Sequence, residues 1–235
     1  MVLQAVILAG GLGTRLRPLT EKIPKVMSPF SGKPFLFYII DLLKRQKIRD
    51  IILCVGYLSD MIKNCFGDGK SFEVSTRYSE EEGRLLGTGG AIKNAQNLLH
   101  DHFLVLNGDT YLPIDYTEVN KVFLKYGKKA VLVAYNNTDT TGVSNNVMVD
   151  KQRKVLAYDK ENRKNLKYVD AGAIILKKGV LDYVKPNQPT SLETIYQMLI
   201  KEGELMAYIT EQRFYDVGTP AQQEDFKNYM EEQIE

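Results

Sequence analysis

The stretch "LQAVILAGGLGTRLRPLT" (residues 3–20) joins an apolar run to a loop that holds three glycines and two arginines. The run at 5–10 has the apolar and β-branched residues of a buried strand. Gly10, Gly11 and Gly13 allow the loop backbone to approach a ligand, so that successive N–H groups can point at phosphate oxygens. Arg15 adds a planar, permanent charge that can contact two such oxygens. The stretch therefore indicates either a phosphate-binding loop or an ordinary glycine-rich turn with solvated arginines.

Two familiar phosphate-binding patterns do not match this loop. It lacks the Lys-Ser/Thr pair that ends a P-loop, and the third glycine of the dinucleotide fingerprint would fall at Leu16. Neither a P-loop NTPase nor a dinucleotide-dependent dehydrogenase fits the sequence well.

Strand-like and helix-like segments alternate along the first 135 residues. The helical period is clearest at 34–46, where Phe35, Ile39 and Leu42 share one face and a basic end suits a helix C-terminus. Alternation of this kind builds βαβ units with right-handed crossovers. We therefore predict an α/β fold with a doubly wound, mostly parallel, Rossmann-like sheet. The expected strands are 5–10, 50–56, 72–78, 103–109 and 128–135, and the other expected helices are 58–66, 90–99 and 117–126.

After Tyr135 the pattern changes to closely spaced strands. "NNVMVD" (145–150) and "KVLAYDK" (154–160) flank a polar turn, and "KYVDAGAIIL" (167–176) follows them. This pattern predicts a small antiparallel insertion on the substrate side of the sheet. A helix at 191–202, a strand near 205–210 and a last helix from Pro220 complete the chain. No repeat or linker divides the sequence, so we predict a single domain over 1–235.

The composition excludes several classes of protein. The 235 residues include 31 Lys and Arg and 29 Asp and Glu, a net charge of +2 that is too balanced for non-specific binding to nucleic acid or an anionic membrane. Cys54 and Cys65 lack metal-ligand spacing, and no apolar run approaches the ~20 residues of a membrane span. We expect a cytoplasmic protein with no nucleic-acid and no membrane partner. The oligomeric state, a homo-oligomer included, stays open.

Two aspartates follow separate predicted strands. Asp109 ends the apolar strand in "FLVLNGD", and Asp216 lies in "RFYDVGT". Two separated carboxylates suit one Mg²⁺ ion, which takes one or two carboxylates and completes its shell with phosphates and water. From residue type alone, each aspartate is more often a turn or N-cap residue.

The stretch "LLGTGGA" (85–91) places several glycines before a predicted helix. Backbone at such glycines can lie against a flat base and a ribose. The alternative is a plain helix entry with Thr88 as its N-cap. More glycines are present than a turn requires, which favours contact with a base.

The segment "LAGGLGTRLRPLT" followed by Pro24–Lys25 resembles the signature of the sugar-1-phosphate nucleotidylyltransferases, also called NDP-sugar pyrophosphorylases. "LGTGGA" and the short chain are most similar to the branch of mannose- and heptose-1-phosphate guanylyltransferases. The likeness covers essentially the whole chain and continues, in the family's order, through "LLGTGGA", "LNGDT" (106–110), "TGV" (141–143), "YDKE" (158–161), "VDAG" (169–172), "SLE" (191–193) and "YDVGT" (215–219).

The resemblance implies roles that residue type alone does not. It assigns Arg15, Lys25 and Asp109 to catalysis, and Asp109 and Asp216 to the binding of Mg²⁺. The half of the chain at about 1–135 would bind the nucleotide, and the half at about 136–235 would bind the sugar phosphate. The family usually has Pro-Lys-Pro where this chain has Val26 after the lysine, which leaves the geometry of that loop open. The implied nucleotide-binding residues are Leu8, Ala9, Gly10, Gly11, Gly13, Thr14, Glu81, Gly87, Thr88, Gly89, Asn107 and Gly108. The implied sugar-phosphate-binding residues are Gly142, Asp159, Lys160, Asp170, Gly172 and Glu193.

The acidic stretch "SEEEGR" (79–84) bears on the choice of base, since related uridylyl- and thymidylyltransferases typically have a glutamine there. A carboxylate can accept hydrogen bonds from guanine N1–H and its exocyclic amine, but it repels the acceptor edge of uracil. Glu80, Glu81 or Glu82 could face the base, with Glu81 slightly favoured. A solvated charge run is the competing interpretation.

The implied reaction joins an NTP and a sugar 1-phosphate to give an NDP-sugar and pyrophosphate, by in-line attack on the α-phosphorus. The expected substrates are GTP and either mannose 1-phosphate or D-glycero-D-manno-heptose 1-phosphate. The expected product would supply sugars for a lipopolysaccharide or a capsule. A UTP-, dTTP- or CTP-dependent enzyme for another sugar or a small phosphate such as phosphocholine is an alternative. A non-catalytic, nucleotide-sugar-binding regulatory subunit is a further alternative, although it would be expected to lack one of the residues assigned to catalysis.

Overall fold

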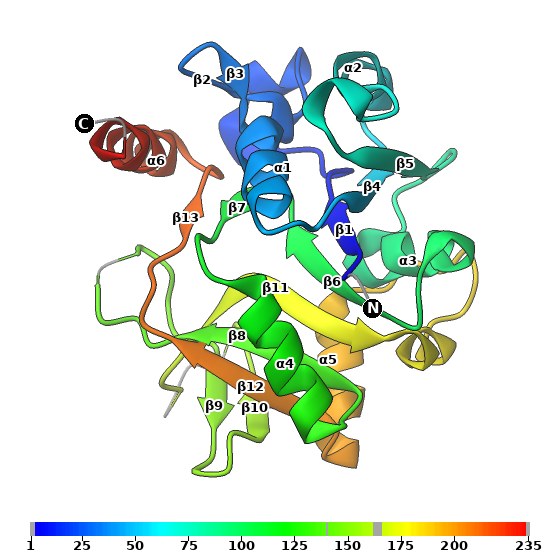
Figure 1. Cartoon of the computed structure of the whole chain (residues 1–235), viewed down its shortest axis with the longest axis vertical. Helices are drawn as coiled ribbons and strands as arrows, with labels where there is room; N and C mark the ends of the chain where they lie inside the picture. The colour runs from blue at the N-terminus through cyan, green and yellow to red at the C-terminus, as the bar shows by residue number, and fades with distance from the viewer. Residues whose placement is uncertain (1–2, 140, 162–165, 234–235) are drawn as a thin grey trace.

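A seven-stranded sheet forms the centre of the computed structural model, which describes residues 3–139, 141–161 and 166–233 (Figure 1). Across the sheet, the strands lie in the order β12 (Leu205–Thr210), β8 (Ala130–Tyr135), β11 (Val169–Lys177), β6 (His102–Asn107), β1 (Ala5–Leu8), β4 (Asp50–Val55) and β5 (Ser75–Glu80). All neighbouring pairs are parallel except the two that β11 makes with β6 and β8. The predicted mostly parallel α/β sheet is confirmed.

Within the described residues, three two-stranded sheets and six α-helices surround the central sheet. The small sheets are β2 (Pro29–Phe30) with β3 (Lys33–Pro34), β7 (Thr110–Tyr111) with β13 (Tyr215–Asp216), and β9 (Val147–Val149) with β10 (Val155–Tyr158). The α-helices are α1 (Phe35–Arg45), α2 (Ser59–Phe66), α3 (Gly87–Asn94), α4 (Tyr116–Tyr126), α5 (Leu192–Glu202) and α6 (Pro220–Glu232). Short 3₁₀ helices include η1 (Thr14–Leu16), η2 (Leu19–Glu21), η3 (Lys25–Met27), η4 (Lys70–Phe72), η5 (Gln96–Leu98) and η6 (Lys178–Tyr183).

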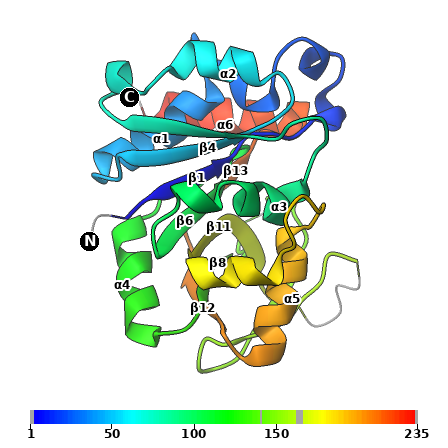
Figure 2. The same cartoon turned by 90° about the vertical axis from the view of Figure 1, so that its right-hand side faces the viewer.

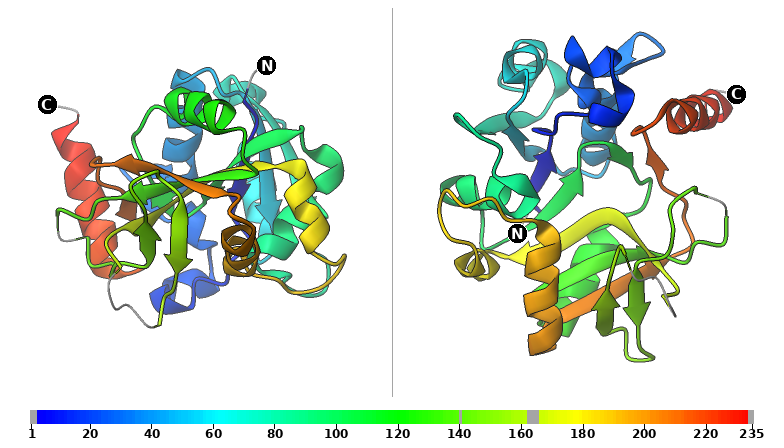
Figure 3. Two further views of the ribbon diagram at one scale, coloured as in Figure 1. Left: turned by 90° about the horizontal axis from the view of Figure 1, so that it is seen from below. Right: turned by 180° about the vertical axis from the view of Figure 1, so that it is seen from behind.

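Both faces of the central sheet are covered. Ala5 and Ile7 of β1 belong to one buried cluster, and Val6 between them belongs to the other, as the two-residue period of a strand requires. Helices α1, α2, α4 and α6 contribute to the first cluster, whereas α3, α5 and η6 contribute to the second. Views along two further directions show α4 and α5 on opposite faces (Figures 2 and 3).

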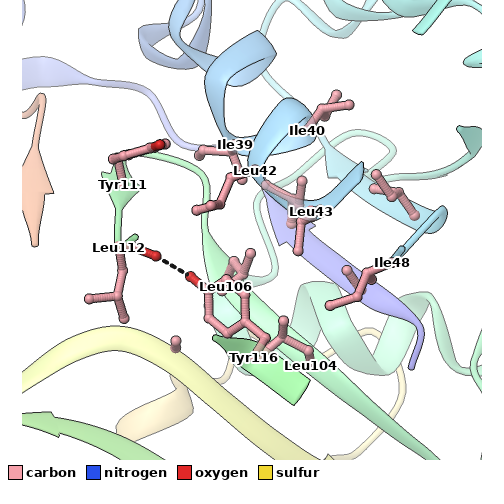
Figure 4. Packing of buried hydrophobic residues seen from close by; sticks show 14 of the residues in the cluster. Ile39, Ile40, Leu42, Leu43, Ile48, Leu104, Leu106, Tyr111, Leu112 and Tyr116 are labelled. Carbon is pink, nitrogen blue, oxygen red and sulfur yellow. Dashed lines mark hydrogen bonds between the residues drawn. The ribbon is translucent and has the colours of Figure 1, made fainter. Parts of the chain in front are cut away.

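Helix α1 illustrates how periodicity becomes packing. Ile39, Ile40 and Leu43 recur on one face and are buried in the first cluster, which also includes residues of the strands and of the segment that precedes α4 (Figure 4). The buried Tyr116, the first residue of α4, donates from its hydroxyl to the Leu112 carbonyl oxygen of that segment at 2.9 Å, which satisfies a polar atom inside the cluster.

Local signals define the ends of several helices. Asp115 accepts hydrogen bonds from the backbone N–H groups of Thr117 and Glu118 and starts α4, and Ser191 caps α5 through the N–H of Thr194. Gly127 and Gly203 end these helices in the left-handed conformation.

Three of the sequence-based assignments differ from the structure by their place in the sheets or by three residues or more at one end, and the others differ by two residues or fewer. The segment 167–176, expected in the antiparallel insertion, instead forms β11 inside the main sheet, because its continuous apolar run suits a strand covered on both faces. The insertion is the β9–β10 hairpin alone. The strand expected at 72–78 begins only at Ser75, after η4.

The helix expected at 90–99 begins at Gly87, so the glycines of "LGTGGA" form its first turn instead of a loop before it. Tertiary contact explains this shift, since the N–H groups of Gly89 and Gly90 donate to the Thr190 carbonyl oxygen at 2.8 and 3.0 Å. The helix ends at Asn94, and η5 follows.

The last helix returns to the N-terminal part of the chain. Phe226 of α6 is fully buried, and its ring centroid lies 4.8 Å from Phe35 and 5.0 Å from Phe30. This contact holds α6 and the preceding β13 beside β7, which pairs with β13 in antiparallel fashion. No helix within 3–139, 141–161 and 166–233 is long and apolar enough to cross a membrane.

We expect Phe226→Ala to lower the free energy of unfolding by about 3–5 kcal/mol, because it removes a buried ring and leaves a cavity among other rings. Leu124→Ala on α4 is the control, since Leu124 is 58% exposed and its loss should change stability by less than about 0.5 kcal/mol. Denaturant unfolding followed by circular dichroism measures both. Equal stability of the two variants would mean that α6 does not anchor the fold.

Candidate active site

The ends of β1 and β6 meet at one edge of the sheet. Leu8 and Asn107 are partners in the parallel register, so the loops that follow these strands leave the sheet side by side. A Cβ at Gly108 would collide with the carbonyl oxygen of Leu8, so only glycine allows this approach. The turn after β6 therefore presents Asp109 beside the glycine-rich loop, at the edge where parallel α/β sheets bind ligands.

Asp109 and Asp216 are brought together by the β7–β13 pair. Thr110 and Asp216 are partners in its register, and the Val217 N–H donates to the Asp109 carbonyl oxygen at 3.0 Å. The Thr110 hydroxyl donates to Asp216 Oδ1 at 2.6 Å. The sequence analysis placed Asp216 after a short strand, whereas it lies within β13, because pairing with β7 extends the strand through it.

Two cations lie beside these carboxylates. Lys25 Nζ, on η3, forms an ion pair with Asp109 Oδ2. Burial and the Asp109 charge raise the pKa of the Asp216 carboxyl, and the Thr110 hydroxyl, Lys25 and Arg15 partly oppose this rise. A Cβ at Gly218 would lie 2.9 Å from Arg15 Nη2, so the guanidinium lies against the backbone that follows Asp216.

The charges at this junction are suited to a divalent cation. Asp109 and Asp216 supply two carboxylates, and burial together with the Asp109 charge raises the pKa of Asp216, so a bound cation would favour its ionised form. Among the described residues, no group of three or more His, Cys, Asp and Glu side chains could hold a metal ion. A metal at the two aspartates would therefore need further oxygens from bound phosphates or water, which is the usual arrangement for Mg²⁺.

A first cavity of about 210 Å³ opens between the glycine-rich loop and α3. Its apolar floor includes the buried Cys54, and burial raises the pKa of that thiol to about 12, so the thiol stays protonated. The cavity is lined by Leu8, Ala9, Gly10, Gly11, Lys25, Val26, Cys54, Glu81, Leu85, Gly87, Thr88, Ala91, Asn107 and Asp109.

Of the three consecutive glutamates, Glu81 is the one that lines the first cavity. Its Oε1 accepts a hydrogen bond from the Leu86 N–H at 2.7 Å, and burial raises the pKa of its carboxyl. Glu80 turns away and pairs with Ser59 and Lys63, whereas Glu82 is exposed.

A second cavity of about 800 Å³ lies on the other side of Asp109. It shares Asn107 and Asp109 with the first cavity, so the two form adjoining compartments with the aspartates and Arg15 at their junction. The second cavity is lined by Arg15, Asn107, Asp109, Thr110, Thr141, Gly142, Val143, Ser144, Asn146, Tyr158, Lys160, Asp170, Arg213, Asp216, Thr219, Ala221, Gln222 and Asp225.

Thr88 lines the first cavity. Its hydroxyl, which the sequence analysis also considered as an N-cap, accepts from the Leu192 N–H at 2.8 Å and links α3 to α5. Several other predicted site residues line neither cavity. Asp159 Oδ1 accepts from the Glu161 N–H at 2.8 Å, next to the cavity residue Lys160. The predicted residues outside both linings are Gly13, Thr14, Gly89, Gly108, Asp159, Gly172 and Glu193.

Other cavity residues were missed by the sequence analysis. Cys54 and Ala91 read as core positions, because their contact with a cavity depends on the packing of β4 against α3. Asn146, Tyr158 and Arg213 lie inside segments that the sequence analysis quoted, but as strand or turn residues, so their positions offered only a weak signal. The contributions of Gln222 and Asp225 depend on how α6 folds back and could not be seen in the sequence.

Comparisons with known proteins agree with this geometry. A family model described as nucleotidyl transferase matches residues 4–233. The chain is 33% identical over 228 residues to the D-glycero-alpha-D-manno-heptose 1-phosphate guanylyltransferase of Campylobacter jejuni. The aligned region covers 97% of this chain and 99% of that protein. It is 31% identical to the mannose-1-phosphate guanylyltransferase of Mycobacterium tuberculosis, over 94% of this chain and 62% of that protein.

A solved structure extends the likeness to three dimensions. The crystal structure of HddC from Yersinia pseudotuberculosis, complexed with GMP-PN, superposes with a TM-score of 0.84 at 30% sequence identity. The superposed region covers 97% of this chain and 100% of the other chain.

Proposed function

The chain belongs to the nucleotidyl transferase family, and we propose on this basis that it transfers GMP from GTP to a manno-configured heptose or hexose 1-phosphate. The resemblance to sugar-1-phosphate nucleotidyltransferases is thereby confirmed. The observation that carries the proposal is the pair of adjoining cavities that meet at Asp109. One cavity suits a nucleotide, and the other suits a polar, anionic acceptor.

The proposed chemistry requires no protein nucleophile. An oxygen of the sugar phosphate attacks the α-phosphorus of the NTP, a new P–O bond forms, and the bond to the β-phosphate oxygen breaks to release pyrophosphate. The attacking phosphate is already anionic near neutral pH, so catalysis is chiefly positioning and electrostatic stabilisation of the transition state.

The residues at the junction suit this reaction. Lys25 lines the first cavity and pairs with Asp109, whereas Arg15 lines the second cavity and lies against the backbone that follows Asp216. The two side chains can therefore contact phosphate oxygens that enter from either side. The guanidinium of Arg15 can follow charge as it develops on two oxygens. Lys25 would exchange its ion pair with Asp109 for substrate oxygens when a metal ion neutralises that carboxylate.

We expect Arg15→Ala to lower kcat at least ~100-fold, on the scale of removing one stabiliser of transition-state charge. Arg17→Ala is a matched control, because Arg17 is also exposed but lines neither cavity. Steady-state pyrophosphate release measures kcat, and thermal unfolding should be unchanged in both variants. Full activity of Arg15→Ala would remove this residue from the mechanism.

Asp109 and Asp216 would hold the Mg²⁺ ion. When bound, the ion would neutralise phosphate charge and orient the reacting phosphates. The two carboxylates lie close together and offer oxygen ligands, which suits a hard cation that takes its remaining oxygens from substrate and water.

Asp109→Asn and Asp216→Asn should each raise the Mg²⁺ concentration needed for half-maximal rate, because each removes an anionic ligand. Asp225→Asn is the control, since Asp225 lines the second cavity but pairs with Arg213 at 2.5 Å. Magnesium titrations of pyrophosphate release measure the effect. Unchanged titrations in both aspartate variants would place the metal elsewhere.

The choice of GTP is supported by two observations. Glu81 is a carboxylate on the lining of the first cavity, and carboxylate oxygens can accept from the N1–H and amino group of guanine. The relatives from Campylobacter jejuni and Mycobacterium tuberculosis are both named guanylyltransferases, and their names also supply the heptose and mannose phosphates as acceptors.

Pyrophosphate release with GTP, UTP, dTTP and CTP, each paired with mannose, heptose and glucose 1-phosphates, tests the whole proposal. We expect the highest kcat/KM for GTP with a manno-configured acceptor. Glu81→Gln should lower kcat/KM for GTP about 10-fold or more, because its amide can still accept from Leu86 but has lost a charged acceptor for guanine.

Glu80→Gln is the control for this substitution, because it changes the neighbouring carboxylate, which lines neither of the two cavities. It should leave nucleotide preference unchanged. If UTP, dTTP or CTP equals GTP with every acceptor, the assignment of the base is wrong, although nucleotidyl transfer would stand.

A further inference from the structure

Tyr158, the last residue of β10, contacts two residues of opposite charge in the second cavity, Asp170 and Lys160. We propose that Tyr158 is a positioning residue for the acceptor, which orients the Asp170 carboxylate and supports the Lys160 side chain. This inference rests on the proposed function, because it assumes that the second cavity takes a sugar 1-phosphate. It assigns Tyr158 no contact with the reacting atoms.

The Tyr158 hydroxyl is directed at Asp170. It donates to Asp170 Oδ2 at 3.0 Å, while the other carboxylate oxygen, Oδ1, accepts from the Gly172 N–H at 2.9 Å. Each oxygen therefore has a hydrogen-bond donor among the described residues. With both oxygens held, the carboxylate plane is set before a ligand arrives.

The ring of Tyr158 is fixed from the opposite side by α5. It packs edge-to-face on Tyr196 with centroids 4.9 Å apart, and its backbone carbonyl accepts from Gln197 Nε2 at 2.6 Å. Only 3% of Tyr158 is exposed, although it borders the cavity. Packing of this kind restricts the ring to one orientation.

Lys160 lies over the same ring. Its Nζ is 5.7 Å from the ring centroid of Tyr158, within the range of a cation–π contact. One aromatic side chain thus touches an anionic group through its hydroxyl and a cationic group through its face. The spacing between Asp170 and Lys160 depends on Tyr158.

The strands around Tyr158 are joined to β11 at this point. Asn146 Oδ1 accepts from the Asp170 N–H at 2.8 Å, and the Asn146 carbonyl accepts from the Asp159 N–H at 2.9 Å. The β9–β10 hairpin therefore docks on the strand that carries Asp170. A rigid second layer of this kind is what a binding site needs to hold its ligand-contacting groups.

The paired arrangement matches the two ends of a sugar 1-phosphate. Its hydroxyls can donate to the Asp170 carboxylate, and its phosphate can accept from the Lys160 ammonium. Burial raises the pKa of the Asp170 carboxyl, and the hydrogen bonds from Gly172 and Tyr158 lower it, so the Tyr158 hydroxyl favours the ionised acceptor form.

The test is Tyr158→Phe, which keeps the ring on Tyr196 and removes only the hydroxyl. We expect KM for mannose 1-phosphate to rise about 10-fold, on the scale of a hydrogen bond to a charged group, with KM for GTP changed less than about 2-fold. Tyr183→Phe is the matched control, because its hydroxyl bonds Lys129 and Glu202 outside both cavities and its removal should change neither KM. A Tyr158→Phe protein with lowered thermal stability but parental KM values would overturn the proposal.

A double-mutant cycle tests whether Tyr158 acts through Asp170. If it does, Tyr158→Phe should raise KM for mannose 1-phosphate less than about 2-fold in an Asp170→Asn background, because the oriented carboxylate is already lost. Multiplicative effects of the two substitutions would overturn this route.

Direct binding separates this inference from the proposed function. Calorimetry with mannose 1-phosphate compares the parent and Tyr158→Phe without turnover. Weaker binding by the variant supports Tyr158 even if the parent releases no pyrophosphate with any NTP, which would overturn only the proposed reaction. Equal binding overturns the role of Tyr158 even if the parent is active. A parent protein that binds no hexose or heptose 1-phosphate overturns both.

Discussion

The pairing of β7 with β13 is the constraint on which the rest of the site depends. These two short strands come from the middle and from near the C-terminal end of the sequence, and their register sets Asp216 opposite Thr110, next to Asp109. Burial and the nearby Asp109 charge raise the pKa of Asp216, so ionising Asp216 costs free energy. This unfavourable pair of charges lies where the two cavities adjoin, and a cationic group or a metal ion bound there would stabilise it. Such local conflict between stability and charge is typical of functional sites.

The antiparallel strand β11 serves the same junction. Parallel strands bring their carboxyl ends to one edge of the sheet, whereas a strand of opposite direction brings its amino end there. In β11, Ala173 pairs with Leu106, so the preceding residues from Asp170 to Gly172 reach the edge at which β6 ends. A single reversed strand thus adds an acidic side chain to the ligand-binding edge without an additional loop.

The two cavities differ in the way that their proposed ligands differ. The first is small and has an apolar floor, and its charged lining residues are Lys25, Glu81 and Asp109, which suits a flat base joined to phosphates. The second is larger and holds several charges of both signs, which suits an acceptor with many hydroxyls and a phosphate. Their shared residues, Asn107 and Asp109, lie where the two ligands would react.

The sequence by itself determined the α/β class, the glycine-rich loop after β1 and most residues of the sheet edge. These features are local, because strand and helix periods, turn glycines and a loop after a buried strand depend on neighbouring residues. The sequence pattern also identified the family through motifs spread along the chain. It misassigned β11 to the insertion, since strand direction and neighbours depend on pairings between distant segments.

Only the tertiary structure decided which side chains share a cavity. Three consecutive glutamates look alike in the sequence, yet the hydrogen bond of Glu81 to Leu86 and the pairing of Glu80 with Lys63 separate their environments. Tyr158 reads as an ordinary strand residue until β10 is packed between α5 and Asp170. Such relations join residues far apart in the chain, so they follow from packing and long-range hydrogen bonds that no local pattern contains.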